Sequence, residues 1–166
     1  MTSARPLFLI DVDGVLNPFA ARRCPPGFSE HQLDGYRVYL AAAHGEWLRG
    51  LAADFELAWA TTWERKANLL IGPLLGLPLL PVISIGRDDP GPSWKLPSVD
   101  RFVGERPFAW VDDDLFSDAR AWAKKRSAPT LLLSADPAVG LTKAHVEKAR
   151  RFAARLRSGA RPLIPD

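Results

Sequence analysis

With 166 residues, of which 47% are hydrophobic and 25% charged, the chain has the size and composition of one globular domain, and we expect a single domain over residues 1–166. No apolar run approaches the roughly 18 to 20 residues that span a bilayer, and the N-terminal apolar stretch is too short for a signal peptide, so we expect a cytoplasmic protein with no membrane segment. The net charge of +3 favours an anionic ligand but is far below the charge density of a dedicated nucleic-acid arm.

Short apolar runs recur along the chain, and each is nearly continuous rather than alternating. Such runs are typical of strands that are covered on both faces, as in a parallel sheet. The predicted strands are residues 7–10, 55–60, 80–85, 108–111 and 130–133, and the segments with helical spacing between them are 44–54, 63–75, 96–103 and 115–126. This alternation predicts an α/β fold, a three-layer α/β/α Rossmann-like domain with a mainly parallel sheet.

Two segments fall outside this alternation. Residues 18–43 contain prolines and glycines and fit a helix poorly, so we interpret them as a flap or small insert after the first strand, with a short hairpin near "LDGYRVYL" and no large cap. Residues 142–166 predict a basic amphipathic C-terminal helix, to about residue 157, and a tail. Its basic face is more often solvated surface than a nucleic-acid contact.

Polar residues stand where the predicted strands end, which is where open parallel sheets bind ligands. Because side chains alternate along an extended chain, Asp11 and Asp13 point to the same side. The residues at this edge are Asp11, Asp13, Thr61, Thr62, Asp112 and Asp113, with Lys95 in a loop before a helix. Four or five carboxylates cannot all stay ionised together without positive charge, so either some hold protons or a hard cation neutralises them. No histidine or cysteine pair indicates zinc, which leaves Mg²⁺ as the natural candidate.

The same residues carry a resemblance. "DVDGVLN" resembles the first motif of the haloacid dehalogenase-like (HAD) hydrolases, "LAWATT" the second, Lys95 the third and "FAWVDDD" the fourth, in the same order over about 110 residues. The sequences "DVDGVLNPF" and "WATTWE" are similar to those of the small HAD domains associated with bacterial RNA-repair systems.

The resemblance implies catalytic roles that the chemistry makes reasonable. Asp11 matches the nucleophile that forms an aspartyl-phosphate, and Asp13 the acid and base that serves the leaving oxygen and then the attacking water. Thr61 matches the hydroxyl that binds a phosphoryl oxygen. Lys95 matches the ammonium that offsets the charge of the nucleophile and phosphoryl group.

The resemblance also implies a magnesium site. Asp11, Asp112 and the main-chain carbonyl of Asp13 would bind Mg²⁺ directly, with Asp113 acting through metal-bound water. Asp114 and Asp118 remain alternatives for the last position, because the spacing of the fourth motif varies. Gly14 lets the chain turn sharply after the strand, and we assign Gly14 and Thr62 to substrate binding.

Each motif also has a purely structural interpretation. Thr61 followed by Glu64 is a capping box, and a loop lysine such as Lys95 is usually solvated. Trp63 and Trp94 flank the second and third motifs. They either line a pocket, where they stack on a base or ring of the substrate, or simply pack in the core.

Together the motifs predict a Mg²⁺-dependent phosphohydrolase, a phosphoric monoester hydrolase of the HAD type. In this superfamily, open sites without a cap often accept bulky substrates such as nucleic-acid ends or proteins. The mild basicity and the flanking tryptophans favour a nucleotide or a nucleic-acid phosphate end as the substrate. Arg22, Arg23 and Arg37 in the flap would meet further phosphates, although solvent-facing arginines are the default. The alternatives are a noncatalytic metal- or phosphate-binding module and a phosphotransferase to an alcohol acceptor.

Overall fold

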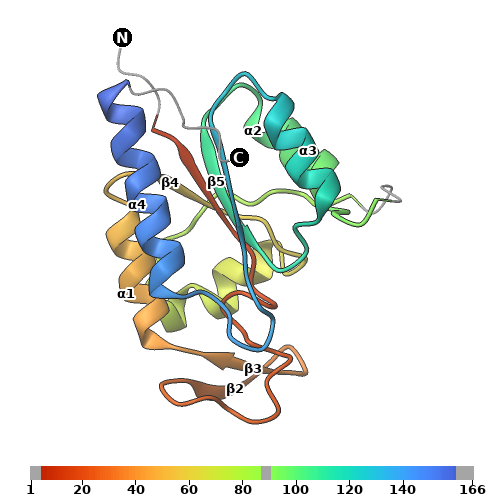
Figure 1. The fold of residues 1–166 in the computed structure, drawn as a ribbon. Helices are drawn as coiled ribbons and strands as arrows, with labels where there is room; N and C mark the ends of the chain where they lie inside the picture. The colour runs from red at the N-terminus through yellow and green to blue at the C-terminus, as the bar shows by residue number, and fades with distance from the viewer. Residues whose placement is uncertain (1–4, 87–90, 160–166) are drawn as a thin grey trace.

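The computed structural model describes residues 5–86 and 91–159, and a parallel sheet lies at its centre (Figure 1). The strands are ordered β4-β1-β5-β6, and every adjacent pair is parallel. Their bounds are β1 Leu7–Ile10, β4 Glu56–Trp59, β5 Phe108–Asp112 and β6 Thr130–Ser134. Because β1 and β5 are adjacent in the interior of this sheet, the residues that follow them meet at one edge.

Helices cover both faces of the sheet. Figure 1 shows α1 (Ala42–Leu51) and α4 (Lys143–Ser158) on one side, and α2 (Leu96–Val103) and α3 (Ser117–Lys125) on the other. The buried side chains of β1 alternate accordingly: Phe8 and Ile10 belong to the core beneath α1 and α4, whereas Leu7 and Leu9 belong to the core beneath α2 and α3. The prediction of a three-layer Rossmann-like α/β domain is confirmed.

Between β1 and α1 the chain forms an antiparallel hairpin of β2 (Ser29–Leu33) and β3 (Tyr36–Leu40). Its two turn residues, Asp34 and Gly35, have φ of 51° and 82°, the positive values that a tight two-residue hairpin turn requires. The hairpin lies beyond the carboxyl ends of the central strands (Figure 1). The backbone N–H of Tyr39 fixes it there by donating to Asn17 Oδ1 at 2.9 Å. The short hairpin predicted from "LDGYRVYL" is therefore present.

The strand predicted at residues 80–85 was wrong, because this segment makes only one bridge to β4, between Trp59 and Val82. The backbone N–H and C=O of Leu80 bind the side-chain amide of Asn68 instead of a neighbouring strand. Pro81 has no N–H to contribute to a ladder. The Asn68 side chain thus takes the backbone bonds of Leu80, and the segment pairs with β4 only through the bonds that Trp59 makes with Pro81 and Ile83.

The helix predicted at 63–75 is also interrupted. It contains a π-helical turn, η1 (Ala67–Ile71), followed by a 3₁₀ turn, η2 (Pro73–Leu75). Pro73 lacks the N–H that would continue an α-helix, and the N–H of Gly72 reaches back five residues to Ala67. The remaining predicted helices agree with α1, α2, α3 and α4 apart from a few terminal residues.

Helix α4 is amphipathic, as predicted from residue 142 onward. Val146, Ala149 and Ala153 are buried, and Thr142 and His145 cap its first turn reciprocally. The tail predicted at 160–166 lies outside the described residues. Among the helices described, none is long and apolar enough to cross a bilayer.

Candidate active site

Asp11 stands immediately after β1, at the carboxyl edge of the sheet, and its side chain is 5% exposed. One carboxylate oxygen, Oδ1, accepts the backbone N–H of Val12 at 2.8 Å, and Oδ2 lies 2.8 Å from Lys95 Nζ. Both oxygens therefore have a fixed partner. The carboxylate of Asp11 is held in one orientation.

Lys95 is buried rather than solvated, so the structural interpretation of a solvent-facing lysine does not hold. Its ammonium lies 2.8 Å from Asp11 Oδ2, 2.7 Å from Asp112 Oδ2 and 3.3 Å from the carbonyl of Ala60. An ammonium has three protons, and these three acceptors match them. Lys95 thus joins the ends of β1, β4 and β5.

The loop that delivers Lys95 is braced by Ser93. Ser93 donates its N–H and hydroxyl to the two oxygens of Asp118, at 3.0 and 2.6 Å, and its hydroxyl accepts the N–H of Phe116. Burial raises the pKa of Asp118, but the hydrogen bonds that its carboxylate accepts from Ser93 and from nearby backbone N–H groups together outweigh this effect and lower the pKa. Asp118, one of the alternatives for the metal site, is therefore engaged in holding the lysine loop.

The cluster formed by Asp11, Asp112, Asp113 and Lys95 contains more acidic than basic groups. Burial and the charge of Asp112 raise the pKa of Asp11 well above its usual range, and Lys95 opposes this only in part. Burial lowers the pKa of Lys95, but the charges of Asp11 and Asp112 raise it more, so the lysine stays protonated. Burial, with the charges of Asp112 and Asp114, raises the pKa of Asp113 to about 6. The site therefore favours an additional positive charge.

Three carboxylates are placed to share one cation. Asp11, Asp112 and Asp113 each offer an oxygen within 4.8 Å of the others. An all-oxygen donor set of this kind suits Mg²⁺, which is usually held by one or two carboxylates together with water. The residues present thus fit the group that the sequence predicted. Asp114 makes other contacts: its backbone N–H donates to Asp112 Oδ1, and its carboxylate accepts the indole N–H of Trp94 at 3.4 Å.

The side chain of Asp13 is held by different partners from those of Asp11. Asn17 Nδ2 donates to one oxygen and Trp63 Nε1 to the other, both at 2.9 Å. Asp13 also lines a pocket of about 550 Å³, together with Asn17, Phe19, Asp34, Tyr36, Arg37, Thr62, Trp63 and Lys66. Its carboxylate therefore faces this pocket.

Thr61 and Thr62 follow β4 and have different surroundings. Thr61 is buried, and its hydroxyl accepts the N–H of Trp63 at 3.2 Å, whereas Thr62 is exposed on the pocket wall. The capping-box interpretation was wrong, because Glu64 accepts the N–H of Ile85 and itself has a positive φ of 46°. In this hydrogen bond the hydroxyl of Thr61 is the acceptor, so the bond does not use the hydroxyl proton.

Gly14 lies directly against Asp113. Its φ is 82°, and a Cβ added there would be 2.3 Å from Asp113 Cγ, less than any real contact. Only glycine allows the first and fourth motifs to approach this closely.

We expect Gly14→Ala to destabilise the protein and to weaken its response to Mg²⁺, because the new methyl group would displace the Asp113 carboxylate. Gly35→Ala is the matched control, since Gly35 has the same φ but no atom within 4 Å of its added Cβ. Strain at this φ alone costs about 1–2 kcal/mol. Urea unfolding with and without Mg²⁺ should show a larger loss for Gly14→Ala. An equal loss in both variants would mean that contact with Asp113 does not matter.

A profile of the HAD domain in Swiss Army Knife RNA repair proteins matches residues 7–146, from the first residue of β1 into the first turn of α4. The chain belongs to this family. The resemblance to small HAD domains tied to RNA repair is thereby confirmed, and a HAD-type hydrolase is supported in general terms. No curated protein matches the chain.

In this HAD domain the four motifs converge at one edge of the sheet. Asp11 follows β1, Thr61 follows β4, Lys95 precedes α2, and Asp112 ends β5. Sequence reasoning missed the residues that support them, above all Asn17 and Ser93. The only available signal was that Asn17 stands in the same turn as Asp13, which does not reveal which atoms meet.

Proposed function

We propose that this HAD domain is a Mg²⁺-dependent phosphomonoesterase that works through an aspartyl-phosphate on Asp11. The observation that carries the proposal is the arrangement of two aspartates two residues apart. Asp11 is buried and paired with Lys95, whereas Asp13 faces the pocket and is held by two neutral donors. The Asp11 carboxylate is placed to attack phosphorus, and the Asp13 carboxylate is placed to transfer protons to and from groups in the pocket.

In the first step a carboxylate oxygen of Asp11 attacks phosphorus while the bond from phosphorus to the ester oxygen breaks. Asp13 gives its proton to the departing oxygen, so that an alcohol leaves. In the second step Asp13 takes a proton from water, the water oxygen attacks phosphorus, and the bond to Asp11 breaks. Phosphate is released, and Asp11 and Asp13 return to their starting states.

Charge neutralisation completes this scheme. The ammonium of Lys95, which touches Asp11, counters negative charge on the transferring group, and Thr61 donates its hydroxyl proton to a phosphoryl oxygen. Mg²⁺, held by Asp11, Asp112 and Asp113, would neutralise charge on the phosphoryl oxygens and fix their orientation.

We expect Mg²⁺ to stabilise the folded protein by about 2.7 kcal/mol when present at about 100 times its dissociation constant. The folded chain holds the Asp113 proton more tightly than the unfolded chain, so without metal the ionisation of Asp113 costs stability as the pH rises from about 4 through about 6. Mg²⁺ removes this cost. The rise in Tm caused by Mg²⁺ should therefore grow between pH 5 and pH 7, as thermal melts would measure. A Tm indifferent to both Mg²⁺ and EDTA at pH 7 would count against the metal site.

The direct test of the proposed function is hydrolysis of a generic aryl phosphate with and without Mg²⁺. Mg²⁺-dependent release of inorganic phosphate is the expected result. Added alcohols that capture the phosphoryl group in preference to water would indicate a phosphotransferase. Binding of Mg²⁺ without any turnover would indicate a noncatalytic module.

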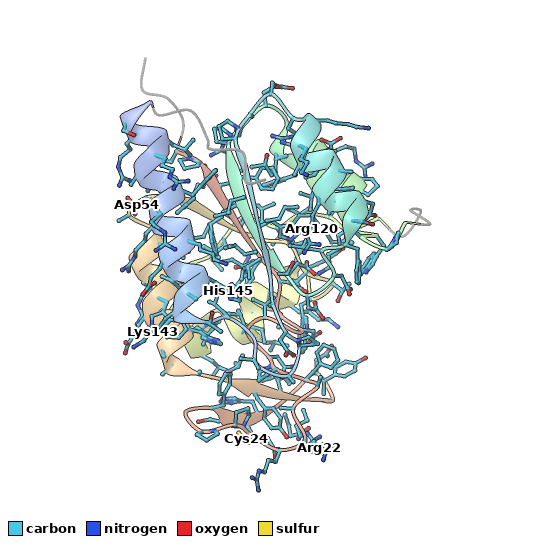
Figure 2. All side chains as sticks on the ribbon, viewed as in Figure 1. Arg22, Cys24, Asp54, Arg120, Lys143 and His145 are labelled. Carbon is cyan, nitrogen blue, oxygen red and sulfur yellow. The ribbon has the colours of Figure 1, made fainter. Side chains whose placement is uncertain are left out.

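We further propose that the substrate is a phosphorylated nucleotide or nucleic-acid end. Between β1 and α1 the site is bordered by a hairpin, which leaves room for a large substrate. Arg22 and Arg23 are exposed, and Figure 2 shows Arg22 at the hairpin end of the molecule. Exposed arginines at this end would attract a polyanion.

A phosphorylated oligonucleotide should accordingly be hydrolysed with a higher kcat/KM than a sugar phosphate. This preference for the oligonucleotide should shrink as the salt concentration rises. Salt screens the contacts between exposed cations and phosphates, and the release of counterions on binding is then less favourable. Steady-state rates at several salt concentrations measure this, and Arg22→Gln with Arg23→Gln should flatten the salt dependence. Equal or better activity on the sugar phosphate, with no salt effect specific to the oligonucleotide, would contradict it.

A further inference from the structure

The pocket beside Asp13 has two aromatic rings that are largely exposed. Phe19 is 55% exposed and Tyr36 is 65% exposed, and both line the pocket together with the nearly buried Trp63. Tyr36 packs edge-on against Trp63, with ring centroids 6.0 Å apart. Large aromatic side chains left open to water beside a candidate acid and base indicate a surface that a ligand covers.

The charges around the pocket are balanced, which bears on what it can hold. Lys66 is paired with Asp34 at 2.5 Å, and Arg37 lies 3.9 Å from Glu30. The two cations that line the pocket therefore already have carboxylate partners, and Asp13 adds another negative charge. A second phosphate group would therefore bind weakly in this pocket. An uncharged planar group would bind better.

The hairpin that carries Tyr36 is held in place relative to Asp13. The side chain of Asn17 donates to Asp13 from Nδ2 and accepts the backbone N–H of Tyr39 at Oδ1, so one amide links the acid and base to the hairpin. The Lys66–Asp34 pair joins the hairpin turn, next to Tyr36, to the segment after β4. A stacking surface that is fixed before binding costs less entropy on association.

We propose that this pocket is the leaving-group subsite and that Tyr36 and Phe19 select a planar aromatic ring, the nucleobase of a phosphorylated nucleoside. The inference rests on the proposed function, because it places the phosphoryl group at Asp11 and the departing nucleoside beside Asp13. A volume of about 550 Å³ is within the usual range for sites that take small organic ligands. Within this pocket the base, not a further phosphate, would then decide how well a monoester binds; the exposed Arg22 and Arg23, which would meet further phosphates of a nucleic acid, do not line the pocket.

The test compares a ribonucleoside 5′-monophosphate with ribose 5-phosphate, which has a hydroxyl group in place of the base. In the wild type the nucleotide should have the higher kcat/KM. Tyr36→Ala and Phe19→Ala should each reduce the ratio of the two kcat/KM values by about 5- to 150-fold, the range expected for losing one stacked base. Tyr36→Phe keeps the ring and should restore the ratio. Phe102→Ala removes a ring of α2 that is 37% exposed and does not line the pocket, and it should leave the ratio unchanged.

An unchanged ratio in both Tyr36→Ala and Phe19→Ala would overturn the subsite. Equal preference for the two substrates in the wild type would do the same. Equilibrium dialysis with the labelled nucleotide and with ribose 5-phosphate separates this inference from the proposed function. Base-dependent binding that Tyr36→Ala abolishes, in a protein without phosphatase activity, would retain the subsite and reject the reaction. Equal binding of the two compounds would reject the subsite.

Discussion

Asp11→Asn should reduce turnover at least about 10³-fold while the fold is kept, because an amide is neither a competent nucleophile nor an anionic metal ligand. Asn keeps an oxygen that can accept the Val12 N–H. Because folding raises the pKa of Asp11, the ionised carboxylate destabilises the folded state relative to the unfolded chain. Removing this charge should therefore leave the Tm of the metal-free protein equal or higher. Steady-state rates and thermal melts in EDTA measure the two effects.

The matched control is Asp100→Asn, an exposed aspartate on α2 that is away from the cluster. It should keep the wild-type rate. If Asp11→Asn retained more than about a tenth of that rate, Asp11 could not be the nucleophile, because losing it should cost several kcal/mol of transition-state stabilisation.

Lys95→Met should have the largest effect on stability, a loss of roughly 3–5 kcal/mol in EDTA. It removes the ammonium that touches both Asp11 and Asp112 and leaves two buried carboxylates without a cation. The loss should be greater at pH 8 than at pH 5, because at low pH a carboxylate with a raised pKa takes up a proton instead. Mg²⁺ should recover part of the lost stability but not the rate. Urea unfolding at the two pH values, with and without Mg²⁺, is the measurement.

Lys124→Met provides the control, since Lys124 is exposed on α3 and should tolerate the change. A Lys95→Met protein as stable in EDTA as the Lys124→Met protein would show that the lysine does not neutralise the cluster.

The sheet and the placement of the motifs could be predicted because they depend on local patterns. β1 and β5 are covered on both faces, and strands of this kind are recognisable in a sequence as continuous apolar runs. The residues that follow them, Asp11 and Asp112, must then lie at one edge. That they meet around Lys95 is a finding of the structure, whereas their chemical roles stay predictions.

The parts that could not be predicted depend on contacts between distant side chains. Asp13 and Trp63 are 50 residues apart, and nothing in either segment indicates that an indole N–H would hold a carboxylate. Asn68 likewise binds the backbone of Leu80 and so prevents a regular strand at 80–85, although the local pattern favours one. Such contacts override local preference because polar groups that are shielded from water, here the partly buried amide of Asn68, must satisfy their hydrogen bonds within the protein.

The most direct test of the proposed reaction is to trap phosphate on Asp11 during turnover. Acid quenching followed by borohydride reduction converts an aspartyl-phosphate into homoserine, which peptide mass spectrometry locates. We expect homoserine at position 11 in the wild type during steady-state hydrolysis, and none in Asp11→Asn. Phosphate release with no modification at position 11, or with the label on another residue, would contradict the account.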